Sequence, residues 1–87
     1  MVFEVIKAEK NELEAHVESL ALAEILRVYL NKDSNVTFAA WKRKHPSEKP
    51  ILKIETEGKT AKKAMNDAIS LIEGDLDKFL TEFKKLK

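Results

Sequence analysis

Cysteine is absent from this sequence, and glycine and proline occur only twice each. Without cysteine the chain can form neither a disulfide framework nor a thiolate metal site. Long hydrophobic runs are also missing, because no apolar stretch approaches the roughly 20 residues that a helix needs to cross a bilayer. Residues 1–7 are too short and too charged for a signal peptide. We therefore expect a cytoplasmic protein without disulfides.

An excess of charge of one sign is lacking as well. The 16 basic and 15 acidic side chains leave a formal net charge of +1, so no overall field attracts phosphate backbones or anionic lipid. Nucleic-acid binding is thus disfavoured as the main role. With 87 residues and 44% hydrophobic content, residues 1–87 are expected to form a single domain. Such a small domain buries only about 60 to 65% of its unfolded surface, so help from a partner would fit its size.

The first half of the chain changes its hydrophobic period twice. Residues 2–7 and 12–18 are predicted strands, the second alternating strictly between apolar and polar side chains. Lys10-Asn11 is the expected turn between them. Ser19 can then cap a helix over residues 20–32.

The second half repeats this order. Residues 36–44 are β-branched and aromatic, which favours a third strand. Two prolines make residues 45–50 a loop, and residues 51–57 are the fourth strand. Thr60 is placed to cap a long last helix, which begins at Ala61. The ββαββα order predicts an α+β domain with an antiparallel four-stranded sheet and both helices on one face.

The first helix is more apolar than a helix lying on a sheet usually is. At roughly 100° per residue, its apolar side chains cover roughly 220° of the circumference. The surplus either meets a partner or is covered by the other helix. The sequence favours neither alternative.

The last helix carries one apolar stripe at three- and four-residue steps, from Ala61 to Leu86. If continuous across Gly74, the helix is about 40 Å long, whereas strands of six or seven residues span only about 20 to 23 Å. About half of it is then expected to project beyond the sheet. Leaving its large apolar side chains in water forfeits roughly 1.5 to 3 kcal/mol each, and such a patch normally marks an interface. A glycine costs about 1 kcal/mol inside a helix, so a break at Gly74 is the alternative.

No set of residues predicts catalysis, a cofactor or a metal ion. His16 alternates outward with glutamates and is expected to be solvated, while His45 precedes a proline and is expected to stabilise a loop. No histidine stands at the spacing of metal ligands or a catalytic triad. Trp41 followed by Lys42-Arg43-Lys44 is the best nucleic-acid candidate, although it reads more simply as the solvated end of a strand.

Several segments in this order resemble archaeal RNA polymerase subunit L. The first helix contains Ile25-Leu26-Arg27-Val28-Tyr29-Leu30, and the next strand contains Val36-Thr37-Phe38-Ala39-Ala40-Trp41, followed by His45-Pro46. Ile51 to Gly58 and the long charged helix from Ala64 to Phe83 complete the similarity, which spans nearly the whole chain. The family usually opens its first helix with an acidic residue, His and Thr, and has Asn before the Leu-Arg pair. Here Ser19, Leu20, Ala21 and Glu24 stand instead, so this turn is expected to be built differently.

The resemblance implies a non-catalytic subunit of DNA-directed RNA polymerase, a nucleotidyltransferase complex. Its expected role is to form a heterodimer with a larger partner, the D subunit of the polymerase, on which the large catalytic subunits assemble. We expect the following residues of the two helices to form the partner interface: Leu22, Ile25, Leu26, Tyr29, Leu76, Phe79, Leu80 and Phe83. Two alternatives remain, a stand-alone homodimeric module that uses the same surface and a small nucleic-acid-binding domain that uses Trp41 to Lys44.

Overall fold

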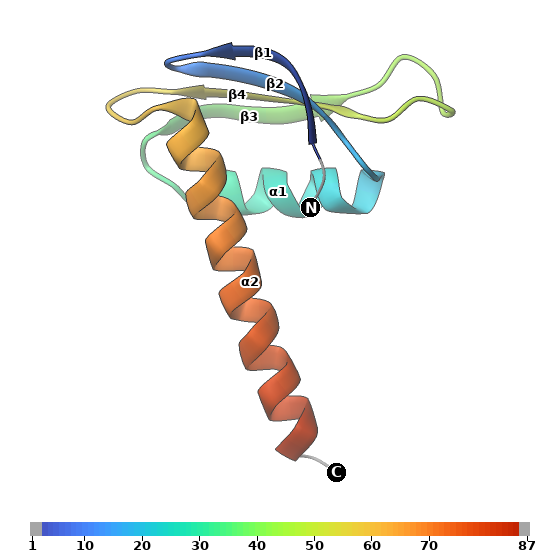
Figure 1. Ribbon diagram of the computed structural model, residues 1–87, viewed down its shortest axis with the longest axis vertical. Coiled ribbons are helices and arrows are strands. Elements are labelled where there is room, and N and C mark those ends of the chain that lie inside the picture. The colour runs from blue at the N-terminus through green and yellow to red at the C-terminus, as the bar shows by residue number, and fades with distance from the viewer. Residues whose placement is uncertain (1–2, 86–87) are drawn as a thin grey trace.

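The computed structural model describes residues 3–85, which form one antiparallel sheet with two helices. The elements are β1 (Phe3–Glu9), β2 (Glu12–Val17), α1 (Leu20–Leu30), β3 (Val36–Lys42), β4 (Ile51–Thr56) and α2 (Ala61–Lys85). The sheet order is β1-β2-β4-β3, so β1 and β3 are its edges. Both helices lie on the same side of the sheet, and α2 then runs away from it (Figure 1). The predicted α+β fold and ββαββα order are confirmed.

The boundaries differ from the prediction by a few residues, each for a local reason. β1 extends to Glu9 rather than residue 7 because its pairing with β2 continues up to the turn at Lys10-Asn11. The predicted first position of that strand lies outside the described residues. β3 ends at Lys42 rather than residue 44, where its pairing with Ile51 ends.

Both helices begin at polar caps. The Ser19 Oγ accepts a hydrogen bond from the Leu22 N–H at 3.2 Å, and Thr60 Oγ1 accepts one from the Lys63 N–H at 3.2 Å, as predicted. α1 stops at Leu30 rather than residue 32, because the backbone then tightens: the Lys32 N–H donates to the Tyr29 carbonyl at 3.2 Å and the Asp33 N–H to the Leu30 carbonyl at 3.1 Å. The turn into α1 is thus built on a serine cap.

The core lies between the sheet and the two helices. The strict alternation predicted for β2 is confirmed, since Leu13, Ala15 and Val17 are buried while the intervening residues are partly exposed. His16, on the outer face, is less solvated than predicted. Its side chain is half-buried, and its Nδ1 has no hydrogen-bond partner among residues 3–85. His45 is exposed, and its carbonyl accepts the Glu48 N–H at 3.0 Å within the β3–β4 loop.

Polar contacts attach the start of α2 to the end of the sheet. The Lys59 ammonium lies 2.5 Å from an Asp33 carboxylate oxygen and 2.7 Å from one of Asp67, joining the α1–β3 loop to α2. These hydrogen bonds lower the pKa of both carboxyls and raise the pKa of Lys59. The Ala61 N–H also donates to the Lys10 carbonyl at 2.8 Å. The direction in which α2 leaves the sheet is therefore set at its first turn.

Candidate partner interface

The apolar stripe of α2 is buried in its first half and exposed in its second. Ala61, Ala64, Met65 and Ala68 are buried against the sheet and α1. Beyond the half-buried Ile72, none of residues 73–85 is buried. The exposed part still carries large apolar side chains at helical spacing: Leu76 (54% exposed), Phe79 (63%), Leu80 (46%) and Phe83 (51%). The same face that forms the core therefore continues beyond it.

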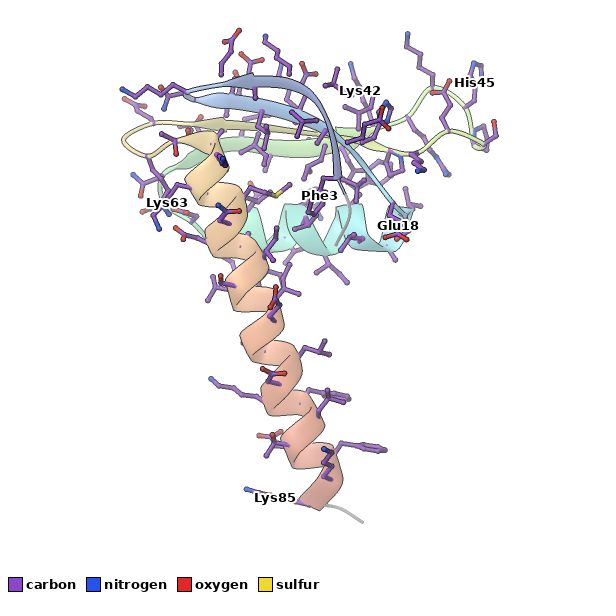
Figure 2. The ribbon with its side chains drawn as sticks, viewed as in Figure 1. Phe3, Glu18, Lys42, His45, Lys63 and Lys85 are labelled. Carbon is purple, nitrogen blue, oxygen red and sulfur yellow. The ribbon has the colours of Figure 1, made fainter. Side chains whose placement is uncertain are left out.

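The helix extends beyond the sheet because it is longer than the strands. At 1.5 Å per residue, its 25 residues span about 37 Å, and strands of six or seven residues span only about 20 to 24 Å. The side chains of its second half project with no sheet beside them (Figure 2). The Phe79 and Phe83 rings stack there on each other with 6.4 Å between their centroids. The predicted projection is therefore present.

Gly74 does not interrupt α2, which is one helix from Ala61 to Lys85. At about 100° per residue, Gly74 lies on the opposite side of the helix from Phe83, and a Cβ built on it meets no atom within 4 Å. The fold-back alternative is therefore wrong for this structure. The apolar stripe runs unbroken past the glycine.

Replacing Gly74 with alanine is expected to stabilise the projecting half of α2 by about 1 kcal/mol, because alanine loses less backbone entropy in a helix. Amide hydrogen exchange in residues 73–85 should slow by about fivefold. Gly58→Ala is the matched control and should destabilise the protein, since Gly58 has φ of +82° and its added Cβ would lie 3.0 Å from the Asn35 Nδ2. Unchanged exchange in Gly74→Ala would contradict the expected stabilisation, and faster exchange would show that the glycine is needed for the helix geometry.

α1 presents different residues to the sheet and to solvent. Leu26 has no exposed surface and packs in the core together with Ala23 and Leu30. Its prediction as an interface residue is therefore wrong, because it faces the sheet. On the other side of the helix Ile25 is 44% exposed and Val28 is 41% exposed. Val28 belongs to the apolar arc noted in the sequence, but without the sheet's direction it could not be separated from the core positions.

Tyr29 marks the point where the two helices cross. Its hydroxyl donates a 2.7 Å hydrogen bond to an Asp75 carboxylate oxygen, which raises the pKa of the tyrosine. The Lys32 ammonium lies 4.4 Å from the centre of the same ring. Leu22 and Tyr29 are half-buried at the border of the core. The crossing places α1 above the exposed half of α2, at an angle to it (Figure 1).

Together the two helices form an L-shaped apolar surface, which we call the apolar corner. Its members are Leu22, Ile25, Val28 and Tyr29 of α1 with Leu76, Phe79, Leu80 and Phe83 of α2. Seven of these eight residues were predicted from the sequence, and Leu26 is replaced by Val28. An apolar surface of this kind is suited to covering by another protein, and the Tyr29 hydroxyl within it is already hydrogen-bonded to Asp75.

Other parts of the described chain offer less to a ligand. Within residues 3–85 no three His, Asp or Glu side chains are grouped to hold a metal ion, and no helix there is long and apolar enough to cross a membrane. Trp41 is half-buried and packs against the core, so its ring is not displayed for stacking on a base.

Comparison with known protein families identifies the family of the chain. Residues 10–82 match the model of the RNA polymerase Rpb3/Rpb11 dimerisation domain. The chain belongs to this family. The predicted resemblance to polymerase subunit L is thereby confirmed.

Individual relatives agree with the family assignment. The Rpo11 subunit of the DNA-directed RNA polymerase of Sulfurisphaera tokodaii is 34% identical, over 100% of this chain and 98% of its own. The Rpo11 subunit of Saccharolobus solfataricus is 37% identical, over 99% of this chain and 98% of its own. That of Thermococcus sibiricus is 40% identical, over 83% of this chain and 82% of its own. All three are RNA polymerase subunits by name.

A solved structure has the same fold. Subunit L of the Thermoplasma acidophilum polymerase superposes with a TM-score of 0.84 at 23% sequence identity, covering 97% of this chain and 86% of that one. The fold of this chain is therefore an architecture already seen in a crystal. The apolar corner belongs to a domain whose family is named for dimerisation.

Proposed function

We propose that this chain is a non-catalytic assembly subunit of a cytoplasmic DNA-directed RNA polymerase, and that it pairs with the larger D subunit through the apolar corner. The observation that carries the proposal is the stripe of α2, which forms the core in one half and continues exposed in the other. Membership in a dimerisation-domain family and the names of the relatives support the same role. Catalysis in the assembled enzyme is assigned to other chains.

The arrangement of the corner suits a helical partner. Ridges of apolar side chains on two crossed helices leave an angle between them, and a pair of helices from another subunit can fill that angle. The corner residues on α2 are about half exposed in the single chain, so a partner can remove further apolar surface of each one from contact with water. A partner that covers them gains on the order of 25 cal/mol for every Å² of that surface.

Co-expression with the D subunit tests the proposal. We expect the two chains to co-purify and to give the mass of a 1:1 heterodimer by size-exclusion chromatography with light scattering. The chain expressed alone is the control, and any self-association through the same corner should be displaced when the D subunit is added. A stable homodimer that excludes this larger partner would contradict the proposal and favour the stand-alone module. The half-buried Trp41 packs against the core, which weakens the nucleic-acid alternative.

A further inference from the structure

An apolar groove, distinct from the apolar corner, lies beneath the edge strand β1. The helices pack chiefly under β2, β3 and β4, so the helix-facing side of β1 is only partly covered. Between this strand and the first half of α2 is a groove of about 300 Å³. Its apolar lining consists of Phe3, Val5, Ala8, Leu13, Ala15, Met65 and Ile69. We call it the β1 groove.

The chemistry of the β1 groove favours an apolar occupant. Three polar side chains also line it, Glu9 from β1 and Lys62 and Asn66 from α2. Its volume of about 300 Å³ is enough for a large aliphatic or aromatic side chain. Val5 is 57% exposed although it lies on the side of β1 that faces the helices. A sheet face of this kind is normally covered by another element.

The groove is continuous with the apolar corner along α2. Asp75 accepts a hydrogen bond from the Tyr29 hydroxyl, so it lies on the flank of α2 that faces α1. At about 100° per residue, Ile69, Leu76 and Leu80 lie together on the other flank, and about 17 Å of helix separates the first from the last. A partner that covers Leu76 and Leu80 therefore lies next to Ile69, at the mouth of the groove.

From this continuity we infer that the same larger partner inserts an apolar side chain into the β1 groove. The inference rests on the proposed pairing and extends it from the two helices to the underside of the sheet edge. The partner's contact then runs from the projecting end of α2 up to β1. Val5 is the groove residue best placed to report it, because it is exposed in the single chain and its replacement does not open the core.

The absence of native cysteine allows a direct test, since one introduced thiol is unique in this chain. Val5→Cys is compared with Ile6→Cys, a neighbour on β1 that is 52% exposed but lies outside the groove lining. Modification of each thiol by N-ethylmaleimide is followed by mass spectrometry of this chain, with and without the D subunit. We expect pairing to slow modification at position 5 by at least tenfold and at position 6 by less than threefold.

Each outcome decides the inference. Protection confined to position 5 supports it. A complex that forms while position 5 stays as reactive as in the single chain overturns the groove contact and leaves the proposed pairing intact. Equal protection at both positions also overturns it, because the partner would then cover the whole edge strand. Failure of any complex to form removes the proposed function, and the groove contact with it.

Discussion

Replacement of Phe79 and Phe83 by aspartate is expected to abolish pairing with the D subunit while the domain still folds. Both residues lie in the projecting half of α2, where 63% of Phe79 and 51% of Phe83 is exposed. Burying a large apolar side chain contributes roughly 1.5 to 3 kcal/mol, and the variant must also bury two carboxylates. A loss of at least about 3 kcal/mol corresponds to a Kd that rises by at least about 100-fold. Titration calorimetry or quantitative co-purification measures it.

The matched control places the same two charges on the other side of the helix. Ser70 and Thr81 lie roughly opposite the apolar stripe at about 100° per residue, and both are exposed. Ser70→Asp together with Thr81→Asp should leave the Kd within about threefold of the original value. Circular dichroism should give the same helical content for both double variants. If the phenylalanine variant pairs as well as the original chain, the projecting half of α2 is not the interface.

Leu26→Ala is expected to lower the free energy of unfolding by about 2 to 5 kcal/mol, because it removes a fully buried side chain from the centre of the core. Domains of this size are stable by only about 5 to 15 kcal/mol, so much of that stability would be lost. Urea unfolding followed by circular dichroism measures the change.

Its neighbour Ile25 is the natural comparison, since it is 44% exposed on the opposite side of α1. Ile25→Ala should cost less than about 1 kcal/mol of stability, as exposed positions usually do. Ile25→Ala should lower the affinity for the D subunit more than it lowers the stability of the chain. Equal losses of stability at the two positions would mean that the side of α1 facing the sheet has been assigned incorrectly.

Much of the fold could be predicted from local patterns. The alternation in β2 and the caps at Ser19 and Thr60 follow from strand and helix geometry that acts within a few residues. The projection of α2 also follows from length, because a 25-residue helix cannot lie along strands of six or seven residues. The Leu-Arg pair, the Phe38 strand and His45-Pro46 predicted the family, which the match over residues 10–82 confirms.

The tertiary structure decided which apolar residues stay exposed for a partner to cover. Helical periodicity gives the angle between Leu26 and Ile25 but not the direction of the sheet, so an interface candidate and a core residue looked alike. The contact of Tyr29 with Asp75 joins residues 46 positions apart, and the β1 groove combines an edge strand with a distant helix. By itself the sequence determined the order of the elements and the excess of apolar surface. Only packing in three dimensions decided where that excess remains exposed, because burial depends on neighbours that are distant along the chain.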